Sequence, residues 1–263
     1  MSDDAAVARR AIPLVDLTDL SDDADEKGAE RLCARGAAAG VAAVCVWPRF
    51  VPVAVAALEG TGVRVATVVN FPSGDEAAYD VGEDAHRAVT AGATEVDVVL
   101  PYRAWLAGDE EHAASVLENV RAVTNEDGRM MKVIIETGML TDRAAIAGAA
   151  GFAIAHDADF VKTSTGKTPV SATPEAAETI LNAIGEWQEH QRARGLFPRV
   201  GLKVSGGVRT VADAAAYLDL ADRIMGDGWV TPQTFRFGAS GLLDALQLAK
   251  RGGLRLVRPG DEY

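Results

Sequence analysis

The stretch FVKTSTGKTPV, residues 160–170, contains the element on which our fold prediction depends. It begins with apolar residues, reaches Lys162, and then changes to small polar residues and Gly166 before a second lysine, Lys167. Burying an ammonium group is costly unless it is paired or neutralised. We therefore interpret the stretch as a buried strand that ends in a functional lysine.

Similar apolar runs recur along the chain and bring the candidate strands to eight. They are VAAVCVW (41–47), VRVATVVNF (63–71), EVDVVL (95–100), MKVIIET (131–137), DFVKTST (159–165), GLKVSGG (201–207), DRIMG (222–226) and FRFGAS (235–240). Nearly continuous apolar runs are typical of parallel strands that are covered on both faces. Helical segments lie between them, the clearest being residues 83–93 and 173–195. This alternation predicts βαβ units with right-handed crossovers.

Eight such units favour an α/β fold of the (β/α)8 TIM-barrel class, with an extra N-terminal helix at about 21–38 before the first strand. A Rossmann-type sheet is the alternative, but no strand is followed by a G-x-G-x-x-G helix opening. No linker rich in Pro, Gly or Ser divides the chain, so we expect one domain over residues 1–263. The segment 251–263 is expected to form a C-terminal tail.

Composition and charge exclude several classes of function. The formal net charge is −12, whereas nucleic-acid-binding surfaces are normally basic. No run of 18 or more apolar residues predicts a membrane span, and no secretory signal pattern is seen, so we expect a cytoplasmic protein. The two cysteines and four histidines show no metal-ligand spacing, so we expect neither a metal nor another cofactor.

Ionisable residues occupy positions in the strands where Val or Ile would be expected: Asp97, Glu136, Lys162 and Lys203. Each one alone could be a buried ion pair or a misplaced strand. If the barrel closes in chain order, however, Lys162 and Lys203 lie on neighbouring strands, and each disfavours the charge of the other. A partly neutral Lys162 could attack a carbonyl to form a Schiff base, and Asp97 could transfer protons.

A second group of residues is typical of a phosphate site. Glycine-rich turns direct backbone N–H groups toward an anion, and barrels often bind phosphate in the loops after their last strands. The candidates after these strands and after Lys162 are Thr165, Lys167, Gly206, Gly207, Arg209, Gly238 and Ser240.

Taken together, the motifs resemble those of deoxyribose-phosphate aldolase over most of the chain. They are LVDLTDL (14–20), CVWPRFV (45–51), ATVVNFPSG (66–74), EVDVVLPYRAWLAGDE (95–110), KVIIETG (132–138), ADFVKTSTGK (158–167), GLKVSGGVRT (201–210) and FRFGASGLL (235–243). The resemblance implies a metal-independent class I aldolase that cleaves 2-deoxy-D-ribose 5-phosphate to D-glyceraldehyde 3-phosphate and acetaldehyde. It places the Schiff-base lysine at Lys162, the proton relay at Lys203 and Asp97, and phosphate contacts at Gly206, Gly207 and Ser240.

The resemblance carries further expectations. Some members end in a tyrosine that assists proton transfer, which corresponds to Tyr263, the last residue of this chain. Some members have two serines where this chain has Ser240 and Gly241, so one hydroxyl donor is missing from the phosphate site. Relatives are often dimers, which is compatible with a homodimer. The alternatives are a Schiff-base aldolase for another phosphosugar and a non-catalytic phosphosugar-binding barrel.

Overall fold

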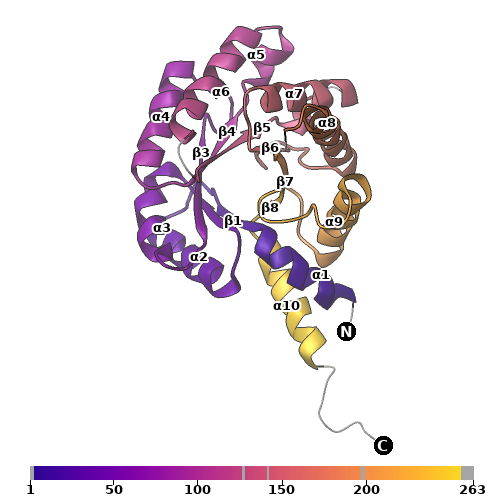
Figure 1. Ribbon diagram of the computed structural model, residues 1–263. Helices are drawn as coiled ribbons and strands as arrows, with labels where there is room; N and C mark the ends of the chain where they lie inside the picture. Colours follow the sequence, from indigo (N-terminus) through magenta and orange to yellow (C-terminus); the bar gives the residue numbers. More distant parts are fainter. Residues whose placement is uncertain (1–2, 126–127, 141, 197–198, 256–263) are drawn as a thin grey trace, which may run out of the picture.

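The computed structural model describes residues 3–125, 128–140, 142–196 and 199–255. Its strands form a closed parallel barrel in chain order, surrounded by helices (Figure 1), which confirms the predicted (β/α)8 class. The strands are β1 (Val15–Asp19), β2 (Ala43–Val46), β3 (Arg64–Val69), β4 (Glu95–Val99), β5 (Met130–Ile134), β6 (Phe160–Lys162), β7 (Gly201–Ser205) and β8 (Phe235–Ala239).

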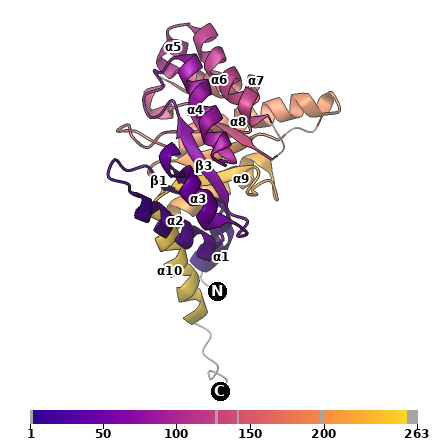
Figure 2. The ribbon, with the colours of Figure 1, turned by 90° about the vertical axis from the view of Figure 1, so that its left-hand side faces the viewer.

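Helices follow the strands and cover the outside of the barrel (Figures 1 and 2). The α-helices are α1 (Asp3–Ala11), α2 (Glu26–Ala39), α3 (Val51–Leu58), α4 (Ala78–Thr90), α5 (Tyr102–Leu106), α6 (Glu110–Thr124), α7 (Arg143–Ala155), α8 (Pro174–Ala193), α9 (Val211–Met225) and α10 (Leu242–Arg255). Three short 3-10 turns are η1 (Ile12–Leu14), η2 (Pro48–Phe50) and η3 (Thr137–Met139). Helix α8 lies within the predicted helical segment 173–195, and Thr173 caps it: its side chain accepts a hydrogen bond from the N–H of Ala176.

One predicted strand was wrong and one real strand was missed. The segment 222–226 is not a strand: residues 222–225 form the last turn of α9, and Gly226 is its C-cap. The missing strand is β1, which contains Asp16, Thr18 and Asp19 and therefore lacks a continuous apolar run. Its apolar residues Val15 and Leu17 pack in the main hydrophobic core, whereas Asp16 belongs to a buried charged network.

The extra N-terminal helix exists, but not at residues 21–38. Helix α2 begins at Glu26 and follows β1, with Asp25 as its N-cap. The extra helix is α1, which lies alongside α10 at the other end of the chain (Figures 1 and 2). Strand β1 also pairs with β8. Because the first and last strands of the described residues pair to close one barrel, we propose a single domain over residues 1–263.

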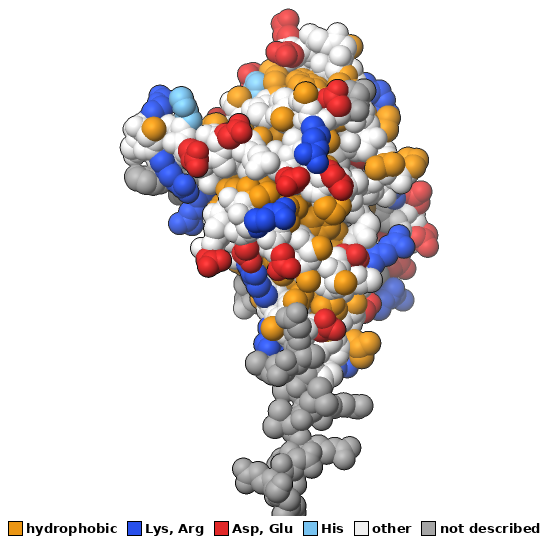
Figure 3. All heavy atoms as spheres, turned by 90° about the vertical axis from the view of Figure 1, so that its right-hand side faces the viewer, with side chains coloured by type: hydrophobic (Ala, Val, Ile, Leu, Met, Phe, Trp, Pro, Cys, Tyr) orange, Lys and Arg blue, Asp and Glu red, His pale blue; other side chains and the backbone are white. Residues whose placement is uncertain are grey.

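The predicted tail 251–263 begins inside a helix. Helix α10 continues to Arg255, and residues 256–263 lie outside the described part of the chain. None of the helices in the described ranges has the length and the apolar character that a membrane crossing would require. Figure 3 shows one face of the molecule, on which acidic and basic side chains are interspersed.

The inside of the barrel is divided into two unlike halves. Small apolar side chains from β2 and β3 form one half: Ala43, Cys45, Ala66 and Val68. Charged side chains from β1 and from β4 to β8 form the other half. Cys45 is fully buried, and burial raises the pKa of its thiol, so that it packs as a small apolar residue.

A capping box fixes the start of α9, next to the loop that follows β7. The hydroxyl of Thr210 accepts from the N–H of Asp213 at 3.0 Å, and the Asp213 carboxylate accepts from the N–H groups of Thr210 and Arg209, each at 2.9 Å. The cap therefore joins the helix to the loop that carries Arg209.

We expect Thr210→Ala to lower the free energy of unfolding by about 1 kcal/mol, because an N-cap hydroxyl is lost. Urea denaturation measures the change. The control is Thr179→Ala inside α8, which should stay within about 0.5 kcal/mol of the wild type. Equal losses in the two variants would show that the cap is not the source of the effect.

Candidate active site

A cavity of about 520 Å³ opens beside the carboxyl ends of β1, β6, β7 and β8. This is the end of a barrel at which active sites form. The loops that follow these four strands supply most of its lining: Thr18, Asp19, Leu20, Ser21, Lys162, Thr165, Gly166, Lys167, Ser205, Gly206, Gly207, Val208, Arg209, Gly238, Ala239, Ser240 and Gly241.

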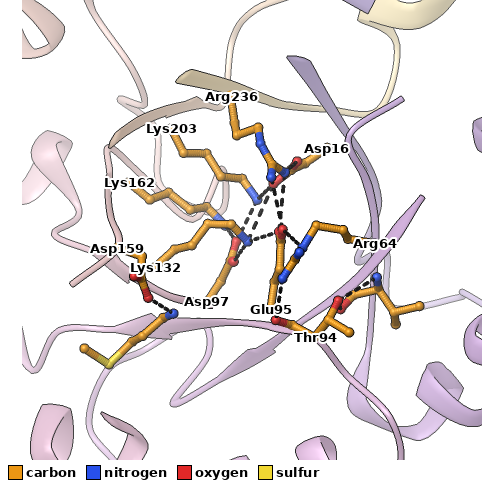
Figure 4. A network of polar contacts seen from close by, with 12 residues as sticks. Asp16, Arg64, Thr94, Glu95, Asp97, Lys132, Asp159, Lys162, Lys203 and Arg236 are labelled. Carbon is orange, nitrogen blue, oxygen red and sulfur yellow. Dashed lines mark hydrogen bonds and ion pairs between the residues drawn. The ribbon is translucent and has the colours of Figure 1, made fainter. Parts of the chain in front are cut away.

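Lys162, Lys203 and Asp97 meet at the base of this cavity. Lys162 is the last residue of β6 and is in register with Lys203 of β7. Both ammonium groups contact the same carboxylate oxygen of Asp97, Oδ2, at 2.8 Å from Lys162 Nζ and 2.7 Å from Lys203 Nζ (Figure 4). Lys162 lines the cavity, whereas Lys203 and Asp97 are fully buried and do not.

The sequence analysis missed a further set of charged residues that extends this cluster toward the other end of the barrel (Figure 4). Lys132 Nζ lies 2.6 Å from Asp97 Oδ1 and 2.7 Å from Glu95 Oε2. Asp16 Oδ2 lies 2.6 Å from Lys203 Nζ, and Arg236 contacts both Asp16, at 2.5 Å, and Glu95, at 3.0 Å.

The sequence did contain a signal for these residues. Glu95 is the first residue of a run that we had assigned as a strand, and Lys132 and Arg236 are the second residues of two others. They stand near the beginning of their runs, where a charged residue usually marks the solvated start of a strand. Only the closed barrel shows that these positions are buried.

The buried part of the network contains four cations and three carboxylates. The cations are Lys132, Lys162, Lys203 and Arg236, and the carboxylates are Asp16, Glu95 and Asp97. A fifth cation, Arg64, is partly exposed and lies 2.6 Å from Glu95. If every group were ionised, the network would carry excess positive charge in a poorly solvated interior. Loss of one proton from a lysine relieves this excess.

The pKa shifts identify the lysine that gives up its proton most readily. Burial lowers the pKa of Lys162, and the neighbouring Lys203 lowers it further, while Asp97 opposes both effects. Burial also acts to lower the pKa of Lys203, but Asp16 and Asp97 outweigh it, so that this pKa is raised. The pKa of Lys132 is raised as well, because the carboxylates around it outweigh burial.

These shifts correct one step of the sequence argument. We expected each lysine to disfavour the charge of the other, with Lys203 as the main cause of a neutral Lys162. In the structure burial is the larger influence on Lys162, and only one of the two lysines has a lowered pKa. The difference arises because Asp16, on the strand that we had missed, pairs with Lys203.

All seven residues predicted for the phosphate side line the cavity: Thr165, Lys167, Gly206, Gly207, Arg209, Gly238 and Ser240. Lys167 is exposed, and its Nζ lies 3.7 Å from Asp22 Oδ1. Arg209 is also exposed. The two cationic side chains therefore stand at the open side of the cavity, where they could meet an anion that enters it.

Two glycines stand where a larger side chain would be crowded. Gly206 has a φ of +84°, and a Cβ there would lie 2.5 Å from the Cβ of Ser171. A Cβ on Gly238 would lie 3.0 Å from Cε of Lys203 and from Oγ of Ser205. Gly238 thus leaves room for the Lys203 side chain, in addition to lining the cavity.

The sequence analysis also expected a contribution from Tyr263 and no metal in the site. Tyr263 lies outside the described residues. Among those residues, no group of three or more His, Cys, Asp or Glu side chains is arranged to hold a metal ion.

We expect Asp97→Asn to destabilise the protein by about 3–5 kcal/mol, because the buried ammonium groups of Lys132 and Lys203 would lose the carboxylate that they share. Chemical denaturation measures this loss. The same substitution at the exposed Asp23 should change the free energy of unfolding by no more than about 0.5 kcal/mol. A small effect at Asp97 would mean that Lys132 and Lys203 do not depend on it as a partner for their charges.

Several solved structures share the fold of this chain. A structure from Toxoplasma gondii ME49, provisionally assigned as a deoxyribose-phosphate aldolase, matches with a TM-score of 0.86 and 24% identity, over 94% of this chain and 95% of that one. A similarly assigned protein from Coccidioides immitis matches at 28% identity and a TM-score of 0.77, over 93% and 86% of the two chains. A tetrameric deoxyribose phosphate aldolase from Aeropyrum pernix matches with 23% identity and a TM-score of 0.71, over 98% of this chain and 94% of that one.

The family model described as DeoC/LacD family aldolase matches residues 10–247, which include the whole barrel. The chain therefore belongs to the DeoC/LacD family of aldolases.

Proposed function

We propose that this protein is a class I aldolase that reversibly cleaves 2-deoxy-D-ribose 5-phosphate to D-glyceraldehyde 3-phosphate and acetaldehyde. Its role would be the breakdown of deoxyribose phosphates. The observation that carries the proposal is the state of Lys162, a buried lysine with a lowered pKa whose side chain lines a cavity. Family membership supports the aldolase chemistry, and the glycine-rich loops support a phosphorylated substrate.

In the first step, the neutral amine of Lys162 attacks the aldehyde carbon C1 of the open-chain sugar. The carbinolamine that forms loses water to give an iminium ion. Lys203, held as an ammonium by Asp16 and Asp97, can supply the proton that the departing hydroxide needs. This step requires a deprotonated lysine next to a protonated one, and the opposite pKa shifts of Lys162 and Lys203 provide that combination.

In the second step, the C2–C3 bond breaks, because acetaldehyde retains only C1 and C2 of the sugar. The C3 hydroxyl loses its proton, C3 becomes the aldehyde carbon of glyceraldehyde 3-phosphate, and the bonding electrons enter the iminium to form an enamine. Asp97 is buried beneath Lys162 and does not line the cavity, so the proton reaches the Asp97–Lys203 pair through a water molecule. Protonation of the enamine at C2 and hydrolysis then release acetaldehyde and restore the Lys162 amine.

The phosphate group would be held by the loops after β7 and β8. Backbone N–H groups around Gly206, Gly207 and Gly241 can donate to its oxygens, with Lys167 and Arg209 at the open side. The backbone N–H of Gly241 takes the place of the second serine hydroxyl found in some relatives. Holding the phosphate there keeps the aldehyde end of the sugar close to Lys162.

Borohydride trapping tests the nucleophile. We expect that acetaldehyde and borohydride add a two-carbon group to Lys162, because reduction makes the imine permanent; mass spectrometry of the digested protein locates it. Lys162→Met should show no adduct at this site and should lose acetaldehyde release from 2-deoxyribose 5-phosphate by at least about 10⁴-fold.

The control for this experiment is Lys27→Met, which removes an exposed lysine and should leave both trapping and turnover unchanged. An adduct on another lysine, with Lys162 unmodified, would contradict the assignment. Turnover of a different phosphosugar without release of acetaldehyde would favour the alternative Schiff-base aldolase. Phosphosugar binding with no adduct would favour a binding barrel.

The pH dependence of imine formation tests the electrostatics. The neutral fraction of Lys162 increases as the pH rises through its pKa, so the rate of trapping should increase with pH and level off below the pH expected for an ordinary lysine. In Lys203→Met, Asp97 Oδ2 would pair with Lys162 alone, which raises the Lys162 pKa. The profile should therefore shift to higher pH, as measured by the initial rate of borohydride-trapped adduct. An unchanged profile would contradict the proposed influence of Lys203.

A further inference from the structure

Glu136 is a buried acidic residue that the mechanism does not use. It follows β5, is fully buried, and is neither in the charged network of Figure 4 nor in the lining of the cavity. Its backbone φ is +51°, in the left-handed region that residues other than glycine rarely adopt. A strained backbone and a buried carboxylate at the active-site end of a barrel suggest a functional constraint.

In the described part of the chain, the hydrogen bonds that this carboxylate accepts come from the loop between β6 and α8. Glu136 Oε2 accepts hydrogen bonds from the N–H of Thr165, at 3.2 Å, and from the Thr165 hydroxyl. Glu136 Oε1 accepts from the hydroxyl of Thr168 at 3.1 Å. The hydroxyl of Thr165 in turn accepts from the N–H of Lys167 at 3.1 Å. A continuous set of hydrogen bonds thus connects the end of β5 to the backbone of Lys167.

The beginning of the same loop is held independently of Glu136. Thr163 N–H donates to the carbonyl of Lys203 at 3.0 Å, and the Thr163 hydroxyl donates to the carbonyl of Ser205 at 3.1 Å. These bonds attach Lys162 and Thr163 to β7. Glu136 therefore acts on the outer part of the loop, residues 165–168, which includes Thr165, Gly166 and Lys167 in the cavity wall.

We propose that Glu136 is a positioning residue that holds the 165–168 segment as one wall of the anion-binding part of the cavity. The proposal rests on the proposed function, in which this side of the cavity receives the substrate phosphate. Glu136 contributes hydrogen-bond acceptors at fixed positions and takes no part in proton transfer at Lys162.

This role makes a sharp distinction between two substitutions. In Glu136→Gln the amide oxygen can still accept from Thr165, and the amide N–H can donate to the hydroxyl of Thr168. The hydroxyl proton of Thr168 is then free to turn to the carbonyl of Val170, 2.9 Å away. In Glu136→Ala all these contacts are lost. A positioning role therefore predicts that Gln preserves what Ala removes, whereas a role in proton transfer predicts that both variants fail.

Two measurements test the proposal: calorimetric titration with inorganic phosphate, and steady-state kinetics on 2-deoxyribose 5-phosphate and on unphosphorylated 2-deoxyribose. For Glu136→Ala we expect the Kd for phosphate and the KM for the phosphorylated sugar to rise about tenfold or more, since charge-assisted hydrogen bonds are lost. Its kcat/KM for 2-deoxyribose should remain within about twofold. Glu136→Gln should stay within about threefold of the wild type in every measurement.

Two further variants serve as controls. Glu118→Ala changes an exposed glutamate of α6 and should change nothing. Thr168→Val removes a single hydrogen bond to Glu136 from a partly exposed position, and it should weaken phosphate binding in the same direction as Glu136→Ala, by about threefold. Thr168→Val keeps the test valid if Glu136→Ala does not fold, which circular dichroism and thermal unfolding would reveal.

The possible outcomes separate this proposal from the proposed function. Unchanged phosphate affinity in both Glu136→Ala and Thr168→Val would overturn the positioning role. So would equal loss in Glu136→Gln and Glu136→Ala on both sugars, because Glu136 would then act on the chemistry. A wild-type protein that binds phosphate but releases no acetaldehyde would overturn only the proposed function, and one that binds no phosphate would overturn both.

Discussion

The proposed chemistry at Lys162 depends on the carboxylate of Asp97 and the three lysines that contact it. Asp97 accepts from Lys132, Lys162 and Lys203 in an interior that is closed to solvent on nearly every side. Ammonium groups so close together would repel one another strongly without it. Asp16 and Glu95 neutralise part of the remaining charge, and the excess is relieved at Lys162, the lysine of this cluster that lines the cavity.

The rest of the structure serves this arrangement in two ways. The apolar part of the barrel interior, from β2 and β3, is built of small side chains such as Ala43, Cys45 and Ala66. The charges of Lys203 and Lys162 act on the pKa of Cys45, so this apolar part borders the lysine cluster. The outer loops then provide a second, more polar environment, with glycines and exposed cations around the cavity. In the proposed function, the reactive amine and the phosphate would therefore occupy one cavity but different electrostatic environments.

The one strand that the sequence analysis missed illustrates why functional residues obscure a fold signal. Strand β1 has three polar or charged residues among its five, Asp16, Thr18 and Asp19, so it lacks the continuous apolar run that identifies a buried parallel strand. The segment 222–226 was assigned wrongly for the opposite reason. Its Ile224 and Met225 are apolar because they complete the inner face of α9. A short apolar run does not distinguish a buried strand from the end of a buried helix.

The barrel class, the candidate amines at Lys162 and Lys203, and the residues proposed for the phosphate side could all be predicted from the sequence. Strand–helix alternation, lysines within apolar runs and glycine-rich turns are local patterns. Which lysine faces the cavity, and in which direction each pKa shifts, became clear only in the folded chain. Those properties depend on burial and on ion pairs between residues far apart in the chain, such as Lys203 and Asp97, which are 106 positions apart. Such distances are set by the register of the closed barrel, and no local pattern encodes them.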